Sequence, residues 1–178
     1  MAISVDTVTS ILHDLIAFDT TSRNSNMQMI DYIAAYLSGQ GLSPRIIKSD
    51  DGNKANLFVT IGRNIEGGIV LSGHSDVVPV DGQKWSSDPF DMAERDGRFY
   101  GRGTADMKGF IACVLAMVPI IADRDLPGPI HLAFSYDEEV GCLGVSRMID
   151  VITAEIPMPC AVIVGEPTNM KIANTHKG

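Results

Sequence analysis

The chain has 178 residues, 45% of them hydrophobic and 6% aromatic, and its formal net charge at pH 7 is −8. This length is enough for one domain built around a single hydrophobic core. The negative charge argues against binding to nucleic acid, because a phosphate backbone requires a basic face. The most apolar stretch, residues 110–122, is too short to cross a bilayer, so we expect no membrane insertion. The start of the chain also lacks the basic and apolar regions of a signal peptide.

The three cysteines, Cys113, Cys142 and Cys160, lie among apolar neighbours and have no CxxC spacing. An odd number of cysteines at such positions is typical of reduced thiols packed inside a cytosolic protein. We therefore expect a cytoplasmic location and no disulfide framework.

The first part of the chain is predicted to contain two helices followed by three strands. Apolar residues recur at helical spacing in residues 4–18 and 27–41, and Ser4 or Asp6 can cap the first helix. Apolar runs bounded by turn residues then predict antiparallel strands at residues 44–49, 55–62 and 67–76.

A stretch rich in Pro, Gly and Asp, residues 77–106, follows these strands. An irregular segment of this length inside a compact domain usually carries function. The rest of the chain alternates between helix and strand, with helices at 106–125 and 141–152 and strands at 130–137, 160–168 and from 171 onward. Such alternation predicts an α/β fold, a three-layer arrangement with a mostly parallel or mixed sheet covered by helices.

Histidine and carboxylate side chains follow the predicted core strands or precede the most apolar helix: His74, Asp76, Asp106, Asp137, Glu138, Glu139 and Glu166. Ligands gather at the carboxyl ends of the strands in parallel sheets. We therefore expect these groups to meet at one edge of the sheet.

Each group also has a simpler interpretation. Taken alone, His74 and Asp76 are typical of a local hydrogen-bonded pair, adjacent glutamates of a solvated surface, and Asp106 of a helix N-cap. Asp137 is best interpreted as a solvated or capping acid. The joint placement of all the groups at strand ends nevertheless favours a functional site.

The chemistry of these side chains suits a two-metal hydrolase. Imidazole and carboxylates are ligands for zinc, cobalt and manganese, and two such ions about 3.5–4 Å apart share a carboxylate. Asp76 can accept the ring N–H of His74 that faces away from a metal ion. Of Glu138 and Glu139, one can bind metal while the other stays free to act as a general base.

Five segments resemble, in order, the signatures of the M20 metallopeptidase family: SGHSDVVP, WSSDPFD, DGRFYGRGTADMKG, SYDEEVGC, and IVGEPT with THKG. The resemblance implies a zinc-peptidase-like fold. It also implies a centre with two Zn²⁺ or Co²⁺ ions, in which His74 and Glu166 bind one ion, Asp106 bridges both and Glu139 binds the second.

The same resemblance gives catalytic roles to two further acids. It implies that Glu138 is the general base and that Asp76 is a partner of His74. It also implies a cis peptide bond between Asp106 and Met107. Of the other histidines, His13 and His131 are expected to pack in the core, and His176 to be a structural or hinge residue.

Members of this family are considerably longer than this chain. The resemblance therefore implies that residues 1–178 are the N-terminal portion of an incomplete catalytic domain, without the dimerisation or lid domain and the C-terminal catalytic segment. Those parts carry a second histidine ligand and a histidine that stabilises the oxyanion. We therefore expect one ion at the side of His74, Asp106 and Glu166, or none, and little or no activity from this chain alone, while the intact enzyme is expected to be a homodimer.

Within the family, GRGTADMKG, DEEVGC and GEPTNMKIANTHKG most resemble the members that remove the acetyl group from N-acetylornithine in arginine biosynthesis. The substrate is then a small N-acyl amino acid. Alternatives are a hydrolase of succinyl-diaminopimelate, an aminoacylase, or a metal-binding module without catalysis. A Rossmann-type nucleotide site is disfavoured, because no strand directly precedes the glycines of GRGTADMKG.

Overall fold

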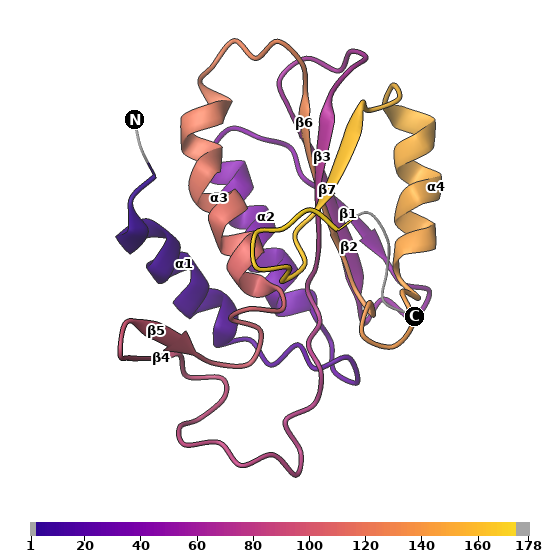
Figure 1. Ribbon diagram of the computed structural model, residues 1–178. Coiled ribbons are helices and arrows are strands. Elements are labelled where there is room, and N and C mark those ends of the chain that lie inside the picture. Colours follow the sequence, from indigo (N-terminus) through magenta and orange to yellow (C-terminus); the bar gives the residue numbers. More distant parts are fainter. Residues whose placement is uncertain (1–2, 174–178) are drawn as a thin grey trace.

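The computed structural model describes residues 3–173, which form three layers (Figure 1). A five-stranded sheet lies in the middle, with three helices on one face and one helix on the other. The helices are α1 (Val5–Ile16), α2 (Met27–Gly39), α3 (Lys108–Ala122) and α4 (Val145–Glu155). The strands of this sheet are β1 (Arg45–Lys48), β2 (Ala55–Ile61), β3 (Ile69–His74), β6 (Ile130–Ser135) and β7 (Ala161–Val164).

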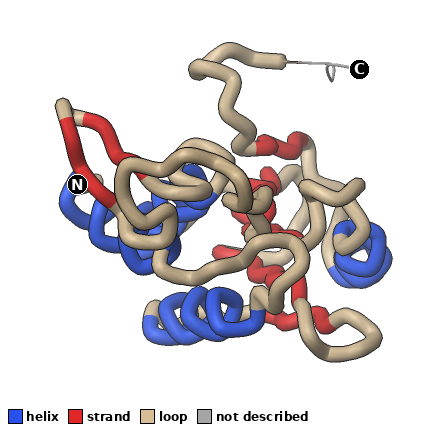
Figure 2. Tube along the Cα trace, turned by 90° about the horizontal axis from the view of Figure 1, so that it is seen from below, coloured by secondary structure: helices blue, strands red, loops and turns tan. Residues whose placement is uncertain are grey.

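The strand order is β1-β2-β6-β3-β7. The pairs β1–β2 and β2–β6 are antiparallel, whereas β6–β3 and β3–β7 are parallel. Helices α3 and α4 make the crossovers that join the parallel strands, and they lie on opposite sides of the sheet (Figure 2). The predicted α/β class with a mixed sheet is therefore confirmed, and the carboxyl ends of β3, β6 and β7 meet at one edge.

The alternation of side chains along β2 explains the two unequal cores. Leu57 and Val59 face the large core formed with α1, α2 and α3, whereas Phe58 faces the smaller core under α4. Helix α3 is apolar almost all round because it lies between α1 and the sheet, and Leu115 on it is completely buried.

A buried lysine joins the first helix to the start of α3. The Nζ atom of Lys108 donates hydrogen bonds to the carbonyl oxygens of Leu15, at 3.0 Å, and Phe18, at 2.7 Å. Burial lowers the pKa of Lys108 to about 7, against the opposing attraction of Asp19. Because Lys108 follows Asp106 by two residues, these bonds also help to fix the position of Asp106 beside the carboxyl ends of the strands.

Several expectations need correction. The stretch 77–106 contains a hairpin of β4 (Ala93–Arg95) and β5 (Arg98–Tyr100), which was expected to be irregular. Residues 171–173 are not in a strand, and His176 lies outside the described residues. In the described part of the chain, no helix is long and apolar enough to span a membrane.

Two expectations about packing were also wrong. The cysteines Cys113, Cys142 and Cys160 are free, as expected, but all three are exposed rather than packed. Exposed His13 faces Asp14 and Asp91, because it lies on the outer face of α1. The prediction for His131 is confirmed, since its side chain is completely buried.

The surroundings of His131 predict how stability depends on pH. Its ring stacks on Phe58, its Nδ1 lies 2.9 Å from Thr60 Oγ1, and its Nε2 has no hydrogen-bond partner among the described residues. Burial lowers the pKa of His131 below its ordinary value of 6.5. Below that value the unfolded chain binds a proton that the folded chain excludes, so the free energy of unfolding falls as the pH falls.

We therefore expect the free energy of unfolding of wild type to fall below about pH 6.5 more steeply than that of His131→Asn. The difference between the two slopes should reach up to about 1.4 kcal/mol per pH unit. Urea unfolding of both proteins at intervals between pH 8 and pH 5 measures the two slopes. Parallel curves for the two proteins would contradict the prediction.

Candidate metal centre

The predicted site residues come together where three parallel strands end. His74 is the last residue of β3, the acids Glu138 and Glu139 follow β6, and Glu166 follows β7. Asp106 reaches the same place from the segment before α3. The fold thus joins groups that are far apart in the sequence.

The side chains surround the imidazole of His74, which is 1% exposed. Its Nε2 atom lies 3.0 Å from an oxygen of Asp106, 3.8 Å from Glu166 and 3.9 Å from Glu138. One ligand atom each from His74, Asp106 and Glu139 lie within 4.8 Å of one another, so these three could hold a single metal ion. A pocket of about 160 Å³ borders His74, Glu138 and Glu166.

A main-chain carbonyl sets the orientation of the His74 ring. The Nδ1 atom lies 2.9 Å from the carbonyl oxygen of Asp76, whereas the carboxylate of Asp76 is 3.6 Å away. A carbonyl can only accept, so Nδ1 carries a proton, and Nε2 on the other side of the ring faces the acids. The expected partner of the ring was the carboxylate, and the structure places the carbonyl there instead.

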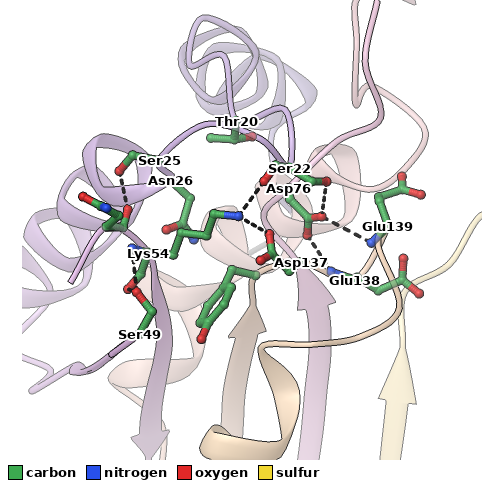
Figure 3. Close-up of polar contacts among 12 residues, drawn as sticks. Thr20, Ser22, Ser25, Asn26, Ser49, Lys54, Asp76, Asp137, Glu138 and Glu139 are labelled. Carbon is green, nitrogen blue, oxygen red and sulfur yellow. Dashed lines mark hydrogen bonds and ion pairs between the residues drawn. The ribbon is translucent and has the colours of Figure 1, made fainter. Parts of the chain in front are cut away.

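The carboxylate of Asp76 holds the two glutamates. It is buried, and it accepts the backbone N–H groups of Glu138, at 3.0 Å, and Glu139, at 3.2 Å (Figure 3). It also accepts the hydroxyl of Ser22 at 2.7 Å. Three donors therefore satisfy this buried charge, and Asp76 fixes the backbone that carries both glutamates.

The site is rich in negative charge. Burial, followed by the nearby carboxylates of Asp106 and Glu138, raises the pKa of Glu139 above its usual value. Burial also raises the pKa of Glu166, and Asp106 adds to this effect. Such shifts mean that the acids are crowded and that a cation placed among them would be attracted.

His74 responds in the opposite sense. Burial alone would lower the pKa of His74, but the charges of Asp76, Glu166 and Asp106 outweigh burial and raise it. One imidazole nitrogen with several carboxylate oxygens is the donor set that Zn²⁺ and Co²⁺ accept. The residues present therefore fit a divalent ion of this kind.

The segment before α3 delivers Asp106 to His74. The peptide bond between Asp106 and Met107 is cis. Met107 occupies the N-cap position of α3, so the simpler interpretation of Asp106 as a helix cap is wrong. The sulfur of Met107 accepts the backbone N–H of His74 at 3.2 Å, which ties this segment to the end of β3.

The interpretation of Asp137 as a solvated or capping acid is wrong. Asp137 is buried, and its carboxylate forms an ion pair with Lys54 at 2.5 Å. Lys54 and Ser22 are contacts of the site that sequence reasoning missed. They lie 83 and 54 residues from Asp137 and Asp76, so no local spacing indicates them.

The contacts of Asp76 predict that it stabilises the fold. Replacement by Ala leaves two backbone N–H groups and the Ser22 hydroxyl without their acceptor, so we expect Asp76→Ala to lower the free energy of unfolding by about 1–3 kcal/mol. Urea unfolding measures this change. The matched control Asp125→Ala, at an exposed position, should stay within about 0.5 kcal/mol of wild type. Equal stability of the two variants would contradict the prediction.

The chain is similar in sequence to known proteins. Residues 70–176 match the family described as Peptidase family M20/M25/M40. The acetylornithine deacetylase of Pasteurella multocida (strain Pm70) is 41% identical over 155 residues, which are 86% of this chain and 40% of that protein. The acetylornithine deacetylase of Buchnera aphidicola subsp. Acyrthosiphon pisum (strain Tuc7) is 35% identical over 174 residues, 94% of this chain and 45% of that protein. The chain thus spans less than half the length of these relatives.

Solved structures share the fold. An M20 family metallo-carboxypeptidase from Sulfolobus solfataricus superposes with a TM-score of 0.79 at 22% identity, covering 90% of this chain and 37% of that one. Human carnosine dipeptidase 1 gives a TM-score of 0.73 at 22% identity, covering 89% of this chain and 38% of that one. The expected zinc-peptidase-like fold is therefore confirmed, and the chain belongs to peptidase family M20/M25/M40.

Proposed function

We propose that this chain contributes to a metal-dependent amide hydrolase that removes the acetyl group from N-acetylornithine. The observation that carries the proposal is the gathering of His74, Asp106 and Glu139 within ligand distance of one another. The substrate is supported by relatives named acetylornithine deacetylase at 35–41% identity.

In this proposal His74 and Glu166 would hold one Zn²⁺ or Co²⁺ ion, Glu139 would hold a second, and Asp106 would be a ligand of both. The bound ions would supply Lewis-acid polarisation of the amide carbonyl. The proton on Nδ1 of His74, held by the Asp76 carbonyl, keeps the Nε2 lone pair directed into the site.

The remaining acid, Glu138, takes the proton. Its half-buried carboxylate lies beside His74 and is held through its backbone by Asp76. Glu138 accepts a proton from water as the water oxygen bonds to the amide carbon. It then returns that proton to the nitrogen as the carbon–nitrogen bond breaks. The new carboxyl group gives its own proton to the released amine, which leaves acetate and the protonated amine.

We also propose that residues 1–178 are the N-terminal portion of the catalytic domain. The support is that the matched relatives are more than twice as long as the segment they share with this chain. The second histidine ligand, the oxyanion donor, the dimerisation or lid domain and the C-terminal catalytic segment would then lie outside this sequence. The homodimer and the cytoplasmic location stay predictions.

Metal content of the 178-residue chain tests the proposed centre. We expect purified wild type to contain Zn²⁺ or Co²⁺ by mass spectrometry, nearer one ion than two per chain. Asp106→Ala should lose the ion because Asp106 contacts both positions. The matched control Glu66→Ala, at an exposed acid in the turn that precedes β3, should keep it because that turn lies at the opposite end of β3 from His74. Loss of metal in both variants would refute the centre. Wild type that stays free of metal after soaking would mean that residues 1–178 do not form the centre by themselves.

A longer protein that includes this chain tests the reaction. Hydrolysis of N-acetylornithine faster than of N-succinyl-diaminopimelate supports the proposed substrate, and the reverse order favours the other hydrolase. Metal uptake without hydrolysis of any N-acyl amino acid would favour a metal-binding module.

A further inference from the structure

The turn that carries the two glutamates is held on two sides. Asp76 accepts the backbone N–H groups of Glu138 and Glu139 from one side. On the other side, the carboxylate of Asp137 receives the ammonium group of Lys54 (Figure 3). Asp137 has a φ of 56°, in the left-handed region that non-glycine residues adopt rarely. The Lys54 contact is the one described side-chain interaction of the Asp137 carboxylate, and it keeps that residue in place.

Lys54 itself is attached to rigid parts of the fold. Its backbone N–H donates to Ser49 Oγ at 3.0 Å, and the following residue, Ala55, exchanges hydrogen bonds with the side chain of Asn26. The Nζ atom also donates to the carbonyl oxygen of Ser22 at 2.5 Å. These contacts hold Lys54 and its ammonium group in place independently of Asp137.

Ser22 connects Lys54 to Asp76, the two residues that hold the turn at residues 137–139. Its carbonyl accepts from Lys54, and its hydroxyl donates to the carboxylate of Asp76. Its own backbone N–H donates to Val77 O at 3.1 Å, just beyond the end of β3. Segments near residues 22, 54 and 76 thus form one hydrogen-bonded frame around the acids at residues 137–139.

We propose that Lys54 is a positioning residue, which holds Asp137 so that the carboxylates of Glu138 and Glu139 face His74 and Asp106. The expected effect of Lys54 on metal binding rests on the proposed function, because Lys54 then helps to form the metal centre. Lys54 contacts neither the substrate pocket beside His74 nor the proposed ligands. Its effect is transmitted through Asp137 and the backbone of the turn.

The sign of the effect on metal affinity separates positioning from simple electrostatics. Lys54 carries a positive charge close to a cation site, so its removal would by Coulomb's law strengthen cation binding. Loss of positioning has the opposite effect, since outer contacts of a metal site typically change affinity by about 10–100-fold when removed. We expect Lys54→Met to bind Co²⁺ about 10–100-fold more weakly than wild type, as measured by calorimetric titration.

Two further variants sharpen the test. Lys48→Met removes an exposed lysine of β1 and should retain wild-type affinity. Lys54→Met combined with Asp137→Asn removes the buried charge that the single variant leaves without a partner. We expect this double variant to recover thermal stability but to keep the weak affinity for Co²⁺. Full recovery of affinity would mean that Lys54 only neutralises Asp137, and would overturn the proposal.

Amide exchange of the metal-free chain provides a second measurement. In Lys54→Met, the amides of Glu138 and Glu139 should exchange at least about 10-fold faster than in Lys48→Met, the change expected for loss of one charge-assisted hydrogen bond. Equal exchange in the two variants, or equal or tighter Co²⁺ binding by Lys54→Met, overturns the role of Lys54. If wild type takes up no Co²⁺, the centre does not form in this chain alone, while amide exchange still decides whether Lys54 holds the turn.

Discussion

The buried carboxylate of Asp76 is the interaction on which the rest of the candidate site depends. A carboxylate is stable inside a protein only if hydrogen bonds replace the water it loses. Here the replacements are the backbone N–H groups of Glu138 and Glu139 and the hydroxyl of Ser22. The requirement to satisfy one charge therefore draws the end of β6 and the segment before α2 toward the end of β3, and these are the segments that build the site.

The same constraint explains how three consecutive acids can follow a core strand. The backbone N–H groups of the last two donate to Asp76, which leaves their side chains directed to the side of His74. Asp137 is turned the other way and is neutralised by Lys54. The acids thus face two different positive groups, an ammonium that the chain supplies and, in the proposed function, a divalent ion. Burial raises the pKa of Glu139, and the nearby carboxylates of Asp106 and Glu138 raise it further. A cation placed among these acids would therefore be attracted.

The sequence predicts those features that depend on local pattern. Helical spacing marks α1 and α2 and alternating helix and strand marks the parallel part of the sheet, since both follow from burying apolar side chains. Among the candidate site residues, His74, Asp106 and Glu139 were predicted because they follow or precede apolar segments, and the structure brings these three together. The β4–β5 hairpin was missed although Asp96 and Gly97, both with positive φ, form the two-residue loop that such hairpins prefer.

Contacts set by tertiary structure were beyond the sequence. Nothing in the local pattern joins Lys54 to Asp137, because both are polar residues at the ends of separate segments. The exposure of His13 depends on which face of α1 packs against α3. Hydrophobic spacing indicates the approximate direction of that face, but it does not show whether a residue at its border is buried. Asp76 was identified as a partner of His74, but its main contacts are backbone groups, which carry no sequence signal.

The two sides of the candidate centre differ in how firmly the fold holds them. His74 ends a strand with neighbours on both sides, and its surroundings are buried. Glu166 follows β7, an edge strand whose residues Val162 and Val164 are more than half exposed. What fixes Glu166 is Gly165, whose N–H donates to Ser72 O at 3.1 Å and which lies so close to the Phe110 ring that a Cβ there would be 2.0 Å from it. A side chain at position 165 would displace the end of β7, and with it the one acid that the edge strand brings to His74.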